Sequence, residues 1–224
     1  MATERTRPRA SAPRTVVIHH RSGIGDLIWH IPYLRAIAES SAHNKIALVA
    51  RPSCRAADVL AAEDCIEEVI EFDHKPRKSE ARHGKHDSLR AQLDFVRELR
   101  QRRFERAYIF SSRPRYAILA ILAGIPVRAG FGFTAIERLL LNHPPFIHPH
   151  VGEGNWVYPE ATEFSLAHGF ATTPITPKMR VLPTAMEAAR EALHMLPRPR
   201  YVFSIGTSEP RKHWGNEHLS LIHI

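Results

Sequence analysis

Two hydrophobic periodicities alternate along the first 130 residues or so. Short apolar runs rich in β-branched residues predict buried strands at residues 15–20, 45–50, 66–72, 106–112 and 127–132. Between them, apolar residues recur every three or four positions, which predicts helices from residue 26 onwards and over residues 53–63, 89–103 and 116–123. Strands that alternate with helices indicate an α/β fold with a doubly wound parallel sheet.

The later chain predicts a second unit. Residues 172–184 contain three prolines in an extended context and read as a linker, followed by a helix over 185–195 and a new strand from residue 201. We therefore divide the chain into a disordered basic arm (1–13), a Rossmann-like domain (14–171), a linker and helix (172–199), and the start of a second Rossmann-like domain (200–224). The last residues, LSLIHI (219–224), complete no element and match the translated end of a sequencing-library adapter, so we expect them to be non-native.

Composition narrows the class of protein. A hydrophobic content of 44% supports a sizeable core, and two cysteines make no disulfide framework, which fits a reducing compartment. No run approaches 18 apolar residues, and the N-terminal charges precede no apolar stretch, so neither a membrane span nor a secretory signal is predicted. We expect a cytoplasmic protein.

The net charge of +8 is concentrated in two places, because residues 1–14 and 74–106 hold most of the excess Lys and Arg. Residues 74–106 carry eleven Lys or Arg against five Asp or Glu, and the polar, Gly/Pro-punctuated part at 74–87 predicts a mobile loop. Local positive charge attracts anionic partners such as nucleic acid, lipid headgroups or phosphorylated sugars. A solvated charged surface is the plainer interpretation.

Gly23, Gly25 and Asp26 stand between the first strand and its helix, where ligands bind in doubly wound sheets. The two glycines allow a tight turn and close approach of a ligand. Asp26 is either a helix cap or a carboxylate that accepts a hydroxyl proton as a general base. A dinucleotide fingerprint is incomplete, because Ile28 stands where its third glycine belongs.

A second candidate site is GTSEPRKHW, residues 206–214, which follows the last predicted strand. Thr207 and Ser208 supply hydroxyl donors and Lys212 supplies a cation, a combination that can hold a diphosphate and stabilise it as a leaving group. An exposed polar loop is the alternative.

Three segments in this order resemble glycosyltransferase family 9, the ADP-heptose:lipopolysaccharide heptosyltransferases. They are RSGIGDLIWHIPYLRAI (21–37), AGIPVRAGFGFTAIERLLLNH (123–143) and GTSEPRKHWGNEHL (206–219). The resemblance extends over residues 14–218 and departs from the family in that almost all of the second domain is absent.

The resemblance implies a GT-B architecture with the active site between two Rossmann-like domains, residues 14–171 forming the acceptor side. It implies inverting, metal-independent transfer of heptose from ADP-heptose to the lipopolysaccharide inner core, with no cofactor besides the nucleotide-sugar donor. Asp26 matches the general base, and Thr207, Ser208 and Lys212 match the loop that binds the donor phosphates. The truncated chain alone is expected to be inactive.

The implied acceptor is an anionic glycolipid, the lipid A–Kdo core, met at the cytoplasmic face of the inner membrane. Candidate acceptor contacts are basic residues after the fourth strand and in the polar loop, namely Arg113, Arg115, Lys75, Arg77 and Lys78. No metal site is expected, because no Asp-x-Asp motif occurs and the histidines at 143, 148 and 150 lack matching ligand spacing.

Two other functions remain open. A nucleic-acid-binding module would use the basic stretch at 74–106, although that stretch lacks interleaved aromatic residues. Another Rossmann-type nucleotide-binding protein, such as an NAD enzyme, would require the complete glycine fingerprint.

Overall fold

The structure is a computed structural model that describes residues 12–76, 80–151 and 159–200. The chain divides into two compact units, Met1–Val181 and Leu182–Ile224. The predicted arm (1–13) and the start of the second domain (200–224) lie almost entirely outside the described residues. In the second unit, the described residues contain helix α7 (Pro183–Leu193), close to the helix predicted at 185–195.

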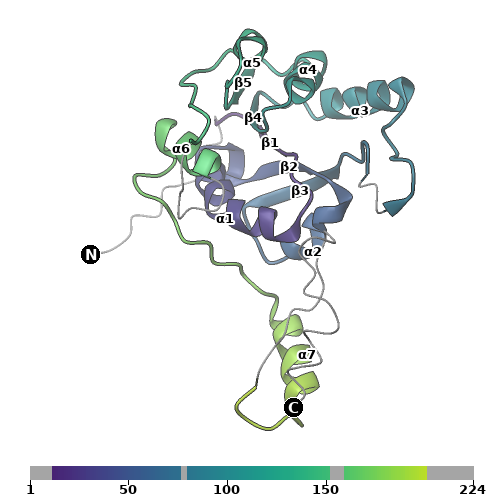
Figure 1. Cartoon of the computed structure of the whole chain (residues 1–224), viewed down its shortest axis with the longest axis vertical. Coiled ribbons are helices and arrows are strands. Elements are labelled where there is room, and N and C mark those ends of the chain that lie inside the picture. The colour runs from purple at the N-terminus through teal and green to yellow at the C-terminus, as the bar shows by residue number, and fades with distance from the viewer. Residues whose placement is uncertain (1–11, 77–79, 152–158, 201–224) are drawn as a thin grey trace. The chain divides into compact units, whose positions relative to one another are not determined.

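The first unit is built on a five-stranded parallel sheet (Figure 1). Its strands are β1 (Thr15–His19), β2 (Ile46–Ala50), β3 (Ile66–Glu71), β4 (Arg106–Phe110) and β5 (Val127–Gly130), in the spatial order β3-β2-β1-β4-β5. The chain runs outward from β1 to β3 and then returns to place β4 beside β1. This reversal makes the sheet doubly wound, which confirms the predicted fold class.

Helices cover both faces of the sheet (Figure 1). They are α1 (Ile24–Glu39), α2 (Ala56–Val59), α3 (Leu89–Gln101), α4 (Pro114–Leu122), α5 (Ala135–Leu140) and α6 (Pro159–Ala167). Single 3-10 turns occur at Ala42–Asn44 and Pro52–Cys54. The sequence did not predict α5 or α6.

Alternation along the strands produces two separate cores. On one face Val17 and Tyr108 pack with α1 and α6, and on the other Val16 and Ile18 pack with α3 and α4. All five residues of β1 and of β2 are buried. Burial on both faces explains why these strands appear in the sequence as continuous apolar runs.

The segment predicted as a linker is fastened to the first unit. Glu63, whose side chain is 1% exposed, accepts two hydrogen bonds from the Arg35 guanidinium of α1, at 2.7 and 2.8 Å. The same carboxylate accepts the backbone N–H of Arg180 at 3.0 Å, and Arg35 also donates to the carbonyl of Lys178. Residues 178–180 are therefore held against α1.

Phe164 anchors α6 in the core, since its ring is fully buried among Tyr108, Phe110 and Phe131. Replacement Phe164→Ala should lower the free energy of unfolding by about 3–5 kcal/mol, because it leaves a cavity. Urea unfolding followed by circular dichroism measures this change. The matched variant Leu166→Ala, on the exposed side of the same helix, should cost less than about 1 kcal/mol, and equal losses would contradict the assigned packing.

Candidate functional site

The carboxyl ends of β1 and β4 meet where the strand order reverses. Residues 20–23 leave β1 there, and residues 111–113 leave β4. The two segments are joined by a hydrogen bond of 2.9 Å between His20 Nδ1 and the carbonyl of Phe110. In open α/β sheets this switch point is where ligands bind, and the predicted Gly-Gly-Asp stretch lies beside it.

Gly23 is the N-cap of α1, and Asp26 lies in the first helical turn. The half-buried Asp26 carboxylate accepts the backbone N–H of Gly23 through Oδ2, at 2.8 Å. Its Oδ1 has no hydrogen-bond partner among the described residues. The carboxylate therefore closes its own helix end and also keeps one oxygen available, so the capping contact and a proton-accepting role are compatible.

The two glycines serve different purposes, and neither has a left-handed backbone. A Cβ at Gly23 would lie 2.7 Å from Asp26 Oδ2, whereas a Cβ at Gly25 would have no heavy atom within 4 Å. A side chain at Gly23 would therefore push the Asp26 carboxylate away from the helix end, whereas Gly25 leaves an open, exposed surface.

Replacement of the two glycines should therefore have opposite effects on stability. Gly23→Ala should cost about 1 kcal/mol, because the new methyl group displaces the Asp26 carboxylate from its hydrogen bond. Gly25→Ala should raise the free energy of unfolding by roughly 0.5 kcal/mol, since alanine is the better helix former and meets no obstruction. Thermal and urea unfolding of both variants measure the difference, and a stabilising Gly23→Ala would refute the close contact.

Histidines line the inner side of the same region. His30 of α1 is buried with its Nδ1 at 2.5 Å from the carbonyl of Asp26, and its ring lies 4.7 Å, centroid to centroid, from that of His19. Burial lowers the pKa of His30 and of His20 to about 4, and it lowers that of His19 well below the usual value. These side chains are neutral at physiological pH, and the sequence analysis had not singled them out.

The buried histidines predict an acid-sensitive fold. His20 and His30 stay neutral in the folded state down to about pH 4, whereas in the unfolded chain they protonate below about pH 6.5. Between these values the unfolded state binds more protons, so the stability present above pH 6.5 is lost as the pH falls, by up to about 1.4 kcal/mol per pH unit for each histidine.

Urea unfolding between pH 4.5 and 8 measures this slope. His30→Gln should flatten it by about one proton, whereas His148→Gln, at an exposed position, should leave it unchanged. An unaltered slope in His30→Gln would contradict the assignment.

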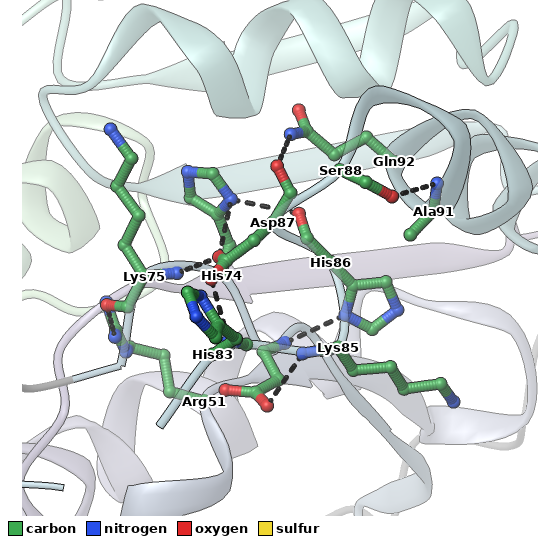
Figure 2. Close-up of polar contacts among 12 residues, drawn as sticks. Arg51, His74, Lys75, His83, Lys85, His86, Asp87, Ser88, Ala91 and Gln92 are labelled. Atoms are coloured by element: carbon green, nitrogen blue, oxygen red, sulfur yellow. Dashed lines mark hydrogen bonds and ion pairs between the residues drawn. The ribbon is translucent and has the colours of Figure 1, made fainter. Parts of the chain in front are cut away.

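The polar stretch at 74–87 forms a loop whose described parts are tied together (Figure 2). Asp87 accepts the backbone N–H groups of Lys75 and Gly84 at 2.6 and 2.7 Å. Asp73 donates its N–H to His86 Nδ1 and accepts that of Lys85, both at 3.0 Å. The predicted mobility of this loop stays a prediction, and in its described parts Asp73 and Asp87 accept backbone N–H groups of the loop itself.

This loop brings two of the predicted acceptor residues together. They are Lys75 of the loop and Arg115 of the first turn of α4. Both line one cleft of about 480 Å³ between α3 and α4. Arg113 is the exposed N-cap residue of α4 and does not line this cleft, whereas Arg77 and Lys78 lie outside the described residues. Thr207, Ser208 and Lys212 lie outside them as well, so the donor-phosphate loop stays a sequence prediction.

Part of the positive charge of the basic stretch is paired with carboxylates, which weakens the nucleic-acid alternative. Three of its arginines form ion pairs at 2.5–2.9 Å: Arg82 with Asp73, Arg97 with Asp94, and Arg102 with Glu68. Within the residues that the structure describes, no group of three His, Cys, Asp or Glu side chains is placed to hold a metal ion. None of the described helices is both long and apolar enough to cross a membrane.

Comparison with solved structures agrees with the architecture of the sheet. The fold is that of one Rossmann-like lobe of a GT-B glycosyltransferase. The family model "Glycosyltransferase family 9 (heptosyltransferase)" matches residues 92–222, more than half of the chain. The chain therefore belongs to glycosyltransferase family 9.

Three solved structures illustrate the likeness, each 18% identical to this chain. A family 9 glycosyl transferase from Veillonella parvula has a TM-score of 0.67, with 94% of this chain and 58% of that one covered. The E. coli ADP-heptose LPS heptosyltransferase II gives 0.62, with 93% and 60% covered. The E. coli heptosyltransferase WaaC with ADP-2-deoxy-2-fluoro heptose gives 0.58, with 92% and 62% covered.

The chain thus spans about three fifths of the length of these structures. No curated protein matches its sequence.

Proposed function

We propose that the whole protein containing this chain is a heptosyltransferase that transfers heptose from ADP-heptose to the lipopolysaccharide inner core, with inversion and without a metal. The observation that carries the proposal is the Asp26 carboxylate beside the switch point, in a chain of glycosyltransferase family 9. The likeness to structures named as heptosyltransferases, one of them with an ADP-heptose analogue, supports the choice of donor.

In the proposed mechanism Asp26 is the general base. The hydrogen bond from Gly23 N–H fixes the carboxylate, and Oδ1 remains free to accept the proton of the acceptor hydroxyl. The resulting oxygen nucleophile attacks the anomeric carbon as the bond to ADP breaks. One direct displacement inverts the configuration at that carbon.

The leaving diphosphate gains negative charge as its bond to the sugar breaks. Lys212 supplies the compensating cation, and the hydroxyls of Thr207 and Ser208 donate hydrogen bonds to phosphate oxygens. Such a set of donors provides stabilisation that a divalent cation supplies in other transferases. These three roles rest on the sequence motif.

The acceptor is a phosphorylated, carboxylated glycolipid, and basic residues of the first unit provide charge complementarity. Arg115 and Lys75 lie together in the α3–α4 cleft, and Arg113 is exposed at the end of β4. Arg77 and Lys78 are further candidates in the same loop. We place the reaction in the cytoplasm, at the inner-membrane surface where such an acceptor is presented.

Substitution at the two reacting ends tests the mechanism. Asp26→Asn should lower kcat by roughly 10²–10⁴-fold, because the amide cannot take the proton. Lys212→Ala should lower it by roughly 10²–10³-fold through loss of leaving-group stabilisation. Initial rates with ADP-heptose and a lipid A–Kdo acceptor, measured as ADP release by the whole protein, give both values.

The matched control is Asp94→Asn, which removes an exposed carboxylate on α3 and should leave kcat unchanged. Rates near wild type in both Asp26→Asn and Lys212→Ala would overturn the assigned roles. Retention of the donor's anomeric configuration in the product, read by NMR, would overturn direct displacement.

A further inference from the structure

The α3–α4 cleft has a polar end and an apolar wall. Its polar end is formed by His74, Lys75 and Arg115. Its wall consists of aliphatic side chains that are 43–74% exposed although large and apolar, namely Leu89, Leu93, Ile118 and Leu122. Exposed aliphatic side chains gathered along two neighbouring helices are unusual on a protein surface unless something apolar binds there.

His74 gives the polar end a defined chemistry. Its Nδ1 lies 2.9 Å from the carbonyl of His86 and 3.4 Å from Asp87 Oδ1, and both neighbours accept hydrogen bonds (Figure 2). Nδ1 therefore carries the ring proton, and Nε2 is left as an acceptor. Burial, helped by the charges of Arg115 and Lys75, lowers the pKa of His74 and outweighs the contacts with His86 and Asp87, which raise it, so the neutral form is maintained.

The Nε2 atom has no hydrogen-bond partner among the described residues, although the side chain is only 8% exposed. In Figure 2 it lies on the side of the ring away from Asp87 and His86. A buried acceptor without a partner is costly in a folded protein, so it points to a donor that the bound state supplies.

The charge at this end is positive. Neither the Lys75 ammonium nor the Arg115 guanidinium has an ion-pair partner among the described residues. Asp87 also lines the cleft, but its two oxygens already accept the N–H groups of Lys75 and Gly84. A ligand that complements the whole cleft would have three parts. These are an anion for the two cations, a hydroxyl group for His74 Nε2 and a hydrocarbon chain for the aliphatic wall.

We propose that the α3–α4 cleft binds the lipid-bearing end of a phosphorylated glycolipid. The phosphate lies between Lys75 and Arg115, a sugar hydroxyl donates to His74 Nε2, and one acyl chain follows the aliphatic wall. This assignment deepens the acceptor side of the proposed function and rests on it. A volume of about 480 Å³ suits part of one chain and its sugar rather than several chains.

Calorimetric titration of the 224-residue chain with soluble ligands tests the proposal. The probe is N-octanoyl-glucosamine 1-phosphate. The chain-free N-acetylglucosamine 1-phosphate and the phosphate-free N-octanoyl-glucosamine should each bind roughly tenfold more weakly or worse. Equal binding of all three would overturn the proposal, as would tighter binding of dihexanoyl phosphatidic acid, which offers a phosphate and chains without the sugar.

Matched variants locate the binding. Leu93→Glu and Arg115→Gln should each weaken binding of the probe roughly tenfold. Leu139→Glu, at an 85% exposed leucine on α5, and Arg97→Gln, at an exposed arginine of α3, are the controls and should bind as wild type does. Equal effects of cleft and control variants would refute the location.

The ring of His74 provides a readout without any substitution. ¹⁵N NMR of the histidine-labelled chain should show Nδ1 protonated before binding, and only Nε2 should shift when the probe is added. An Nε2-protonated ring would overturn the role of His74. The binding experiments contain no ADP-heptose, so they test the cleft alone. The proposed function is tested separately, by heptose transfer to a deacylated acceptor by the whole protein.

Discussion

Burial of the central strands on both faces is the constraint on which the rest of the structure depends. All of β1 and β2 is enclosed between two cores, so no side chain within these strands reaches a ligand. Polar chemistry is therefore confined to the residues that follow the strands. The proposed base, His20 and the cationic end of the α3–α4 cleft all lie in segments that leave the carboxyl edge of the sheet.

Backbone groups rather than side chains fix the polar residues at this edge. Asp26 is oriented by the N–H of Gly23, and Asp87 by those of Lys75 and Gly84. Main-chain donors keep their positions when a ligand arrives, and they add no competing charge. The carboxylates are therefore fixed in place, while Asp26 Oδ1 has no hydrogen-bond partner in the part of the chain that the structure describes.

Most of the sheet was predictable from the sequence, because burial on both faces leaves continuous apolar runs in β1, β2 and β4. Helix α5 was missed although its capping box, Thr134 with Glu137, is visible as Thr-x-x-Glu. Helix α6 has little amphipathic character that sequence reasoning could use, because its buried face includes the polar residues Thr162 and Ser165 while Leu166 is exposed. The position of Asp26 at the strand–helix junction followed from the glycine pattern.

The cleft was not predictable in this way. His74 Nε2 is a hydrogen-bond acceptor because His86 and Asp87 hold the ring proton on Nδ1. The folded-back loop brings these two residues to His74 from twelve and thirteen positions away. The local pattern of hydrophobic and polar residues does not predict that the loop folds back on itself. Polarity of the same residues indicated mobility, since the sequence alone does not show that their carboxylates bind backbone N–H groups.

The clamp of Arg35 and Glu63 on residues 178–180 decides how much of the predicted linker belongs to the first unit. The chain after α6 has no helix or strand from residue 171 to residue 182, but residues 178 and 180 are hydrogen-bonded to Arg35 and Glu63 of the first unit. Residues 172–181 therefore belong to the first unit, and the boundary falls at Leu182, one residue before the proline that begins α7. A segment whose prolines suggest a link between two domains is thus, over most of its length, part of the first of them.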